Sequence, residues 1–296
     1  VRYAVESGGK RLRPILLISA CRWAGGTTEQ ALEAAYAMEL FHNFTLVHDD
    51  IMDQASLRRG KAVVFKKFGL NAALLAGDVM LTLSHRAIAR AADRADQIEL
   101  VHCFDDMAVA ICEGQQLDSD AESERSISVE EYLEIIEKKT AVLLAACLQI
   151  GGLLGGVNEK ESELLYDYGL LTGKAFQIQD DYLDVFGVSE RTGKEKGGDI
   201  LRNKKTFLYL KALERANKED RTALIELFEQ GRGVSGRNKV NRVIEIYNRY
   251  GVDSAAEEVK EKYLTDATQC LNVLADEGKS VQLLEYLGQR LLYRSS

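Results

Sequence analysis

Three features of the sequence predict an all-α fold. The chain has 296 residues but one proline, and long uninterrupted helices explain that scarcity because proline breaks helix interiors. No stretch alternates apolar and polar residues over the length of a typical strand. No Ser/Gly/Pro-rich linker or repeat of fixed period divides the chain. We therefore predict one all-α domain over residues 1–296, incomplete at its N-terminus because the chain begins at Val1 without Met.

The first helices can be placed from their boundary residues. A helix over residues 15–23 follows Pro14, which suits a first turn because its missing N–H costs little there. Thr27 is a capping residue for a helix over residues 29–52, whose wide apolar surface predicts burial. After a polar break at residues 56–60, further apolar helices are expected over residues 71–92 and 98–117.

The second half of the chain continues this pattern. Residues 118–125 are highly charged and predict a loop. Ser128 and Glu131 resemble a capping box before a helix over residues 129–151. The remaining expectations are a helix over residues 159–186, a glycine-rich mobile flap over residues 187–205, and amphipathic helices over residues 206–294.

Composition excludes several classes of function. The net charge of −8 argues against non-specific binding of nucleic acid. No run of apolar residues is long enough to predict a membrane span. The five cysteines are scattered and form no C-x-x-C pair, so we expect a reducing, cytoplasmic location with the cysteines as small core residues.

Two short acidic motifs of the form D-D-x-x-D stand at residues 49–53 and 180–184. On a helix, residues four apart share a face, so their carboxylates stack and repel each other. A divalent cation removes that repulsion, and Mg²⁺ sites often combine carboxylates with substrate phosphates. The motifs therefore predict two helices that hold a diphosphate through Mg²⁺. The alternative is two solvated acidic faces, which the flanking apolar residues disfavour.

Basic clusters accompany both acidic motifs. Residues 8–14 read G-G-K-R-L-R-P, and residues 58–60 read R-R-G. Glycine lets the backbone approach a ligand closely, while lysine and arginine bind phosphate oxygens. A surface basic run and simple salt bridging to the aspartates are the alternatives. Further cations near the second motif are Lys139, Lys194, Lys196, Lys204 and Lys205.

Taken together, these motifs resemble those of the trans-isoprenyl diphosphate synthases, the polyprenyl synthase family. The shared motifs are the basic run at residues 8–14, D-D-x-x-D at residues 49–53, L-R-R-G at residues 57–60, G-Q-x-x-D at residues 114–118, K-T at residues 139–140 and F-Q-x-x-D-D-x-x-D at residues 176–184. They occur in the family's order. The C-terminal third is similar only in its helical character.

The resemblance implies a helical bundle around a deep central cavity, usually as a homodimer. It implies a prenyltransferase that condenses isopentenyl diphosphate with an allylic diphosphate, with Mg²⁺ as cofactor. By motif position, Mg²⁺ is bound by Asp49, Asp53 and Asp180, with Asp50, Asp181 and Asp184 in support through ligation or water. The allylic diphosphate is held by Arg58, Lys139 and Lys204, with Lys194 nearby, and isopentenyl diphosphate by Lys10, Arg13, His42 and Arg59. Thr140 and Gln177 lie near the developing cation, and Gln115 and Asp118 orient lysine and metal-bound water.

Helix geometry also predicts product length. Phe44 and Thr45 precede Asp49 by about one turn, roughly 5.4 Å. An aromatic ring at Phe44 forms a floor that stops chain growth, with Phe41 one turn lower; ordinary core packing is the alternative. In the family, an aromatic residue at this place resembles the geranylgeranyl-forming type, whereas Thr45 departs from one farnesyl-forming pattern. We expect a C20 product first and C15 second.

Three other functions compete with this interpretation. A class I terpene cyclase of the same helical type ionises a diphosphate without a second substrate, but normally lacks the basic run and the second full motif. A non-catalytic regulatory subunit usually has degraded aspartate motifs. Residues 231–236 fit the dinucleotide pattern G-x-G-x-x-G, but no strand precedes them. His42, two turns before Asp49, is more often structural in such a place, and only the resemblance assigns it a ligand.

Overall fold

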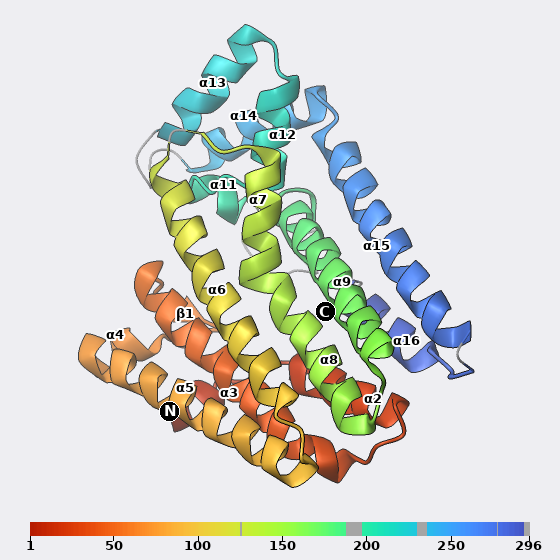
Figure 1. The fold of residues 1–296 in the computed structure, drawn as a ribbon. Coiled ribbons are helices and arrows are strands. Elements are labelled where there is room, and N and C mark those ends of the chain that lie inside the picture. Colours follow the sequence, from red (N-terminus) through yellow and green to blue (C-terminus); the bar gives the residue numbers. More distant parts are fainter. Residues whose placement is uncertain (125, 188–196, 230–235, 277, 293–296) are drawn as a thin grey trace. The chain divides into compact units, whose positions relative to one another are not determined.

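The computed structural model describes residues 1–124, 126–187, 197–229, 236–276 and 278–292 (Figure 1). Within these ranges nearly all regular structure is helical, and the one sheet is a two-stranded hairpin. The prediction of an all-α fold is confirmed. The chain divides into two compact units, each described by itself: unit 1 (Val1–Ala108, Leu143–Tyr166 and Leu274–Leu284) and unit 2 (Val109–Val142, Asp167–Val273 and Glu285–Ser296). A single domain over residues 1–296 stays a prediction.

The helices follow the expected order. The first are α1 (Arg2–Val5), α2 (Leu12–Trp23), α3 (Thr28–Met52), α4 (Val64–Phe68), α5 (Leu70–Ala95) and α6 (Glu99–Ser123). Next come α7 (Val129–Ile136), the π-helical turn η1 (Glu137–Ala141), α8 (Val142–Gly155) and α9 (Glu159–Phe186). The last are α11 (Gly198–Leu201), α12 (Phe207–Arg215), α13 (Lys218–Glu229), α14 (Gly236–Arg249), α15 (Val252–Asp276) and α16 (Gln282–Leu292).

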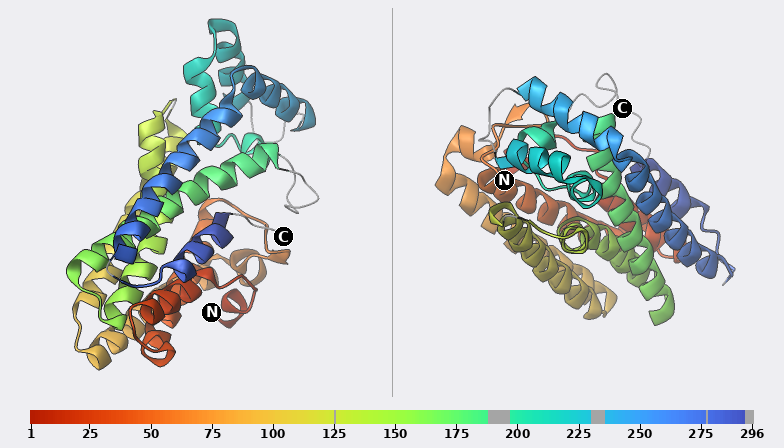
Figure 2. Two further views of the ribbon diagram at one scale, coloured as in Figure 1. Left: turned by 90° about the vertical axis from the view of Figure 1, so that its right-hand side faces the viewer. Right: turned by 90° about the horizontal axis from the view of Figure 1, so that it is seen from above.

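Helix α3 is the central helix of unit 1. It begins as predicted, with a capping box in which the Gln30 N–H donates to Thr27 Oγ1 at 3.3 Å and the Thr27 N–H donates to Gln30 Oε1 at 2.7 Å. Its apolar residues, among them Met38 and Phe41, are fully buried. Helix α5 lies alongside it (Figures 1 and 2). The predicted burial of this helix is confirmed.

Helix α6 corrects the expected loop at residues 118–125, because it continues through that charged stretch to Ser123. Side chains one turn apart support the extension: Gln116 Nε2 donates to Asp120 Oδ1 at 2.8 Å. Ala121 is buried on the inner face of the helix. Asp120 and Glu122 are exposed on this helix, so the charged stretch does not mark its end.

The predicted helix over residues 129–151 is interrupted at η1, where the backbone takes a π-helical turn. Two glycines of unit 2 make room for this turn. A Cβ on Gly114 would lie 2.5 Å from Lys139 N, and one on Gly173 would lie 2.6 Å from Ala141 Cα. Both contacts are too short for any other residue. Such π turns occur often at functional sites.

The segment at residues 187–205 is partly helical, since α11 occupies Gly198–Leu201. The rest of the predicted flap, residues 188–196, lies outside the described residues, as does most of the G-x-G-x-x-G string. Helices α12, α13 and α14 group together in unit 2 (Figures 1 and 2). The prediction of C-terminal helices is confirmed over the described part of residues 206–294.

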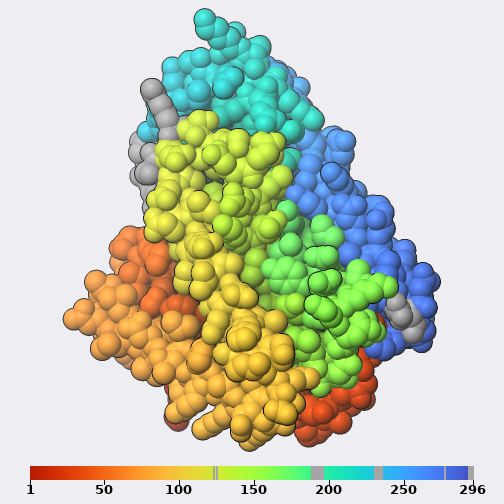
Figure 3. All heavy atoms as spheres, in the orientation of Figure 1, coloured from red at the N-terminus to blue at the C-terminus, as the bar shows by residue number. Residues whose placement is uncertain are grey.

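The first half of α5 exposes several large apolar side chains. Its side chains Leu70, Leu74, Leu75 and Val79 are each at least 41% exposed, and α5 lies on the surface shown in Figure 3. The stretches Leu70–Ala95 and Val129–Gly155 are long and apolar enough for a membrane span. That is weak evidence, because buried core helices meet the same criterion, and 67% of the apolar window in the second stretch is buried.

Among the cysteines, Cys21 and Cys147 are buried core residues as predicted, whereas Cys112 is exposed and departs from that expectation. The cytoplasmic location stays a prediction.

Candidate functional site

A tight hairpin in unit 1 positions two arginines. Strands β1 (Leu57–Arg58) and β2 (Lys61–Ala62) pair in antiparallel fashion. The two residues between them, Arg59 and Gly60, both have positive φ, at 53° and 74°. Positive φ at both central residues is the requirement of a type I′ turn, and glycine meets it at no steric cost. The R-R-G motif is therefore a turn that presents neighbouring guanidinium groups.

The glycines of the basic run contact one of these arginines. Arg59 Nη1 donates to the Gly8 carbonyl oxygen, and a Cβ on Gly9 would lie 2.6 Å from the same nitrogen. The sequence predicted that these glycines let the backbone approach an anion. In the structure the group they approach is the Arg59 side chain, and their approach to an anion stays a prediction.

His42 lies in the middle of this arginine cluster. Arg13 Nη1 donates to His42 Nε2 at 3.1 Å. Burial lowers the pKa of His42 well below its usual value, and the nearby charges of Arg13, Arg59, Arg58 and Arg11 lower it further. A neutral imidazole in this place accepts a hydrogen bond and adds no positive charge. The cluster nevertheless has a strongly positive field that favours an anion.

The other two residues of the run have different surroundings. Arg11 binds Glu39 and the Val5 carbonyl oxygen, and so ties α2 to α1 and α3. Lys10 is exposed.

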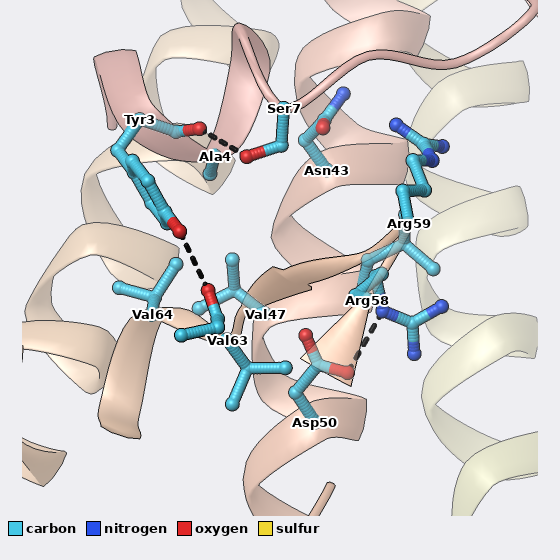
Figure 4. A pocket seen from close by; sticks show the side chains of 12 residues that line it. Tyr3, Ala4, Ser7, Asn43, Val47, Asp50, Arg58, Arg59, Val63 and Val64 are labelled. Carbon is cyan, nitrogen blue, oxygen red and sulfur yellow. Dashed lines mark hydrogen bonds and ion pairs between the residues drawn. The ribbon is translucent and has the colours of Figure 1, made fainter. Parts of the chain in front are cut away.

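A pocket in unit 1 lies between this cluster and the first aspartate motif. Figure 4 shows Arg58 and Arg59 on one side of it, Tyr3, Val63 and Val64 on the other, and Asp50 at one end. The remaining lining residues are Ala4, Ser7, Asn43, Leu46, Val47 and Ala62. The pocket thus combines a basic side with an apolar side.

The first aspartate motif occupies the C-terminal end of α3. The Asp53 N–H donates to the Asp49 carbonyl oxygen at 2.8 Å, so the two residues are one helical turn apart as predicted. A helix C-terminus carries partial negative charge, and no basic residue lies in the last turn of α3. Asp50 is buried and accepts from Arg58 Nε at 2.8 Å. Burial raises the pKa of Asp50, against the lowering effect of Arg58.

The second motif lies near the C-terminal end of α9, in unit 2. Asp181 is buried and accepts hydrogen bonds from the Tyr132 hydroxyl and from Gln177 Nε2. Burial raises the pKa of Asp181 to about 7. Asp184 accepts from the Asp199 N–H at 2.9 Å. Asp180 is half-buried.

Cationic side chains of unit 2 gather around Asp118. Lys139 Nζ donates to Asp118 Oδ2 at 2.5 Å. Burial lowers the pKa of Lys204, but Asp199, Asp181 and Asp118 outweigh it, so this pKa is raised and the side chain stays charged. Asp118, Tyr132 and Lys204 line one pocket. Lys205 instead donates to carbonyl oxygens near the end of α6, including Ala121 O at 2.7 Å.

Two more residues that the resemblance assigns to the site are Gln115 and Lys194. Gln115 hydrogen-bonds Ser119 on its own helix, at 3.4 Å. Lys194 lies outside the described residues.

A row of contacting aromatic rings precedes the first aspartate motif along α3 and includes Phe104 of α6. The Phe44 ring contacts His48 at 4.9 Å and Phe41 at 5.4 Å between centroids, and Phe41 contacts Phe104 at 5.4 Å. His48 is wedged against α5, where a Cβ on Gly77 would lie 2.1 Å from its Nε2. Thr45 Oγ1 donates back to the His42 carbonyl oxygen at 2.9 Å. Phe44 is thus fixed by rings above and below it.

The donor set suits a hard divalent cation that shares its ligands with a substrate. No group of three or more His, Cys, Asp or Glu side chains in the described ranges is arranged to hold a metal by itself. Mg²⁺ is typically bound by one or two carboxylates together with phosphate oxygens. Asp49 with Asp53, and Asp180 with Asp184, are the residues that fit this description in their respective units.

The sequence did not predict two residues that contact the second aspartate motif, Tyr132 and Asp199. Tyr132 reads as an ordinary core position of an amphipathic helix, and Asp199 falls in the segment expected to be a flap. No spacing rule connects either residue to Asp181 or Asp184, because the contacts join separate helices.

Similarity to known proteins identifies the family of the chain. The sequence pattern of the polyprenyl synthetase family matches residues 1–247. The chain is 39% identical to a short chain isoprenyl diphosphate synthase of Methanothermobacter thermautotrophicus, over 99% of this chain and 88% of that protein. It is 36% identical to a geranylgeranyl diphosphate synthase of Methanosarcina mazei, over 96% of this chain and 86% of that protein.

A solved structure extends the similarity to the fold. A crystal structure of a geranylgeranyl pyrophosphate synthase superposes with a TM-score of 0.90 at 41% identity, covering 100% of this chain and 90% of the other. Together with the aspartate motifs and the arginine cluster, these matches show that the chain belongs to the polyprenyl synthetase family and is a prenyltransferase of isoprenoid biosynthesis.

Proposed function

We propose that this prenyltransferase condenses isopentenyl diphosphate head-to-tail with an allylic diphosphate (dimethylallyl, geranyl or farnesyl), with Mg²⁺ as cofactor. The observation that carries the proposal is the cluster of Arg13, Arg58 and Arg59 around a neutral His42. This cluster can hold a diphosphate directly, without metal. A terpene cyclase ionises a single diphosphate and has no use for a second anion site.

Each substrate has its own set of residues. Lys10, Arg13, His42 and Arg59 bind isopentenyl diphosphate. Arg58, Lys139 and Lys204, with Lys194, bind the allylic diphosphate. Asp49, Asp53 and Asp180 bind Mg²⁺, with Asp50, Asp181 and Asp184 in support. Mg²⁺ supplies neutralisation of the negative charge that builds on the leaving diphosphate.

The reaction begins when the allylic C–O bond breaks and its electron pair leaves with the diphosphate. Lysine and arginine stabilise the departing anion more strongly than the intact substrate, which lowers the barrier. Thr140 Oγ1 and Gln177 Oε1, which hydrogen-bond each other at 3.3 Å, present negative dipole ends to the allylic cation. Asp118 holds Lys139 in place through their ion pair.

The second step forms the new carbon–carbon bond. The double bond of isopentenyl diphosphate attacks the allylic cation, and a proton then leaves the new chain and restores a double bond. We assign that proton to the departed diphosphate, as the resemblance to the family implies. Apolar walls must exclude water, which would otherwise trap the cation.

The C20 product is favoured, with C15 second, because Phe44 forms a rigid floor. Its contacts with His48 and Phe41 support this role, since a ring fixed on both sides cannot move aside for a longer chain. Replacing Phe44→Ala should shift the main product to a longer chain, as measured by chromatography of the dephosphorylated alcohols. The exposed Tyr36→Ala on the same helix is the control. Unchanged product length in F44A would contradict the floor.

A homodimer is proposed from the exposed apolar side of α5. Leu75 is 64% exposed and Val79 48%, and a second copy of the chain would bury them. Mass measurement by light scattering should give twice the chain mass, and Leu75→Glu should lower it toward one chain.

The central experiment incubates the protein with Mg²⁺ and dimethylallyl, geranyl or farnesyl diphosphate, with and without labelled isopentenyl diphosphate. Label in a longer prenyl chain supports the proposal. Conversion of the allylic substrate to a hydrocarbon or alcohol without isopentenyl diphosphate would favour a cyclase instead.

A further inference from the structure

The carboxylate of Asp181 is enclosed by protein donors. The Tyr132 hydroxyl donates to Oδ2, and Gln177 Nε2 donates to Oδ1 at 3.0 Å. Asp181 is 2% exposed and Tyr132 is 3% exposed. Each oxygen therefore already accepts a hydrogen bond in a place with little access for water. Its neighbour Asp180 is only half-buried, so adjacent aspartates of one motif have different surroundings.

The bond to Asp181 determines which way the Gln177 amide points. An amide has donors on its nitrogen and an acceptor on its oxygen. With the nitrogen directed at the carboxylate, Oε1 is turned toward Thr140, whose Oγ1 donates to it at 3.3 Å. An amide turned over would place Oε1 against a carboxylate oxygen with no hydrogen between them. The carboxylate thus selects one orientation of the amide.

Tyr132 completes the arrangement from the other side of the π turn. It lies in α7, directly before η1, while Asp181 and Gln177 lie in α9. Thr140 lies in η1 itself. Hydrogen bonds therefore run from α7 to α9 and back to η1. A buried hydroxyl needs a partner, and here its partner is the carboxylate that orients Gln177.

We propose that Tyr132 and Asp181 are positioning residues that fix Gln177 Oε1 and the Thr140 hydroxyl for the reaction, and that Asp181 acts through them and not as a ligand of the metal. This inference rests on the proposed function, which puts Thr140 and Gln177 beside the developing cation. Motif position alone gives Asp181 a supporting role in Mg²⁺ binding, through ligation or water.

The first test compares Asp181→Asn with Asp180→Asn. An asparagine at residue 181 keeps one acceptor oxygen and replaces the other with a donor nitrogen, so it cannot accept from both the Tyr132 hydroxyl and Gln177 Nε2. We expect kcat of D181N to fall about 10²-fold, as for a misplaced catalytic group, with KM for both diphosphates and the affinity for Mg²⁺ little changed. D180N should weaken Mg²⁺ binding, measured by calorimetry with inorganic diphosphate. Equal weakening in D181N, or unchanged kcat, would overturn the proposal.

The second test is a double-mutant cycle between Tyr132→Phe and Gln177→Ala. If Tyr132 acts through Gln177, Y132F should lower kcat in the parent chain and have little further effect in the Q177A background. Equal effects in both backgrounds would assign Tyr132 a general structural role. Circular dichroism and the melting temperature of each variant show whether it is folded.

The calorimetric comparison does not depend on turnover. If the parent chain fails to condense isopentenyl diphosphate, the proposed function fails. The metal-binding comparison of D181N with D180N still decides whether Asp181 is a ligand.

Discussion

The same D-D-x-x-D pattern meets different partners in the two units. In unit 1 the buried middle aspartate, Asp50, pairs with the charged Arg58. In unit 2 the buried middle aspartate, Asp181, accepts from a phenol and an amide, which are neutral donors. Burial raises the pKa of both carboxyls, that of Asp181 to about 7. The comparison teaches that the middle carboxylate of this motif can bond protein groups of different charge in the two units.

The largest effect is expected at the outer aspartates of the two motifs. Asp49→Asn and Asp180→Asn should each lower turnover by about 10²–10³-fold, because each removes a group that holds Mg²⁺ against the leaving diphosphate. Steady-state kinetics at saturating Mg²⁺ measures this. Asp93→Asn, at an exposed site on α5, is the control and should retain full turnover. Normal activity in D49N and D180N would contradict the proposal that Asp49 and Asp180 bind Mg²⁺.

A smaller effect is expected on the stability of the protein when the Asp50–Arg58 ion pair in unit 1 is broken. Arg58→Met leaves Asp50 buried without its cation, which should lower the free energy of unfolding by about 1–3 kcal/mol. We expect the low end of this range, since Arg58 is 36% exposed and water can reach the gap. Urea denaturation of the metal-free protein measures the change. Asp50→Asn in the R58M background should recover part of the loss, and no recovery would argue against an uncompensated carboxylate.

The pH dependence of stability should differ in sign between the units. Burial lowers the pKa of His42 below 6.5, so below pH 6.5 the unfolded chain binds a proton that the folded chain lacks. The free energy of unfolding then falls as the pH drops below this value. Burial raises the pKa of Asp181 from 3.8 to about 7, so the folded chain keeps a proton that the unfolded chain has released. That contribution falls as the pH rises from 3.8 to about 7.

Single variants separate these opposing slopes. Relative to the parent chain, His42→Gln should lose less stability on acidification from neutral pH to pH 5. Asp181→Asn should lose less stability when the pH is raised from 5 to neutral. Urea denaturation of the metal-free proteins at several pH values gives both differences. Parallel curves for all three proteins would mean that neither group is perturbed in the folded state.

The sequence predicted the structure correctly where residues close together in the chain determine it. The Thr27 cap, the one-turn spacing of Asp49 and Asp53, and the helix that carries the second motif all follow from residues within a few positions of each other. The charged stretch at residues 118–125 misled the prediction. Its polar residues include exposed ones on α6 and Asp118, which pairs with Lys139, while Ala121 is buried.

By itself, the sequence determined that the chain is all-α, which residues share helix faces, and which family chemistry its motifs resemble. Only the tertiary structure decided which groups those residues contact: Gly8 and Gly9 hold Arg59, Gly114 and Gly173 admit the π turn, and Tyr132 binds Asp181. The physical reason is the distance along the chain over which each kind of interaction acts. Helix periodicity acts over a few residues, whereas these contacts join segments dozens of residues apart, whose proximity is set by packing.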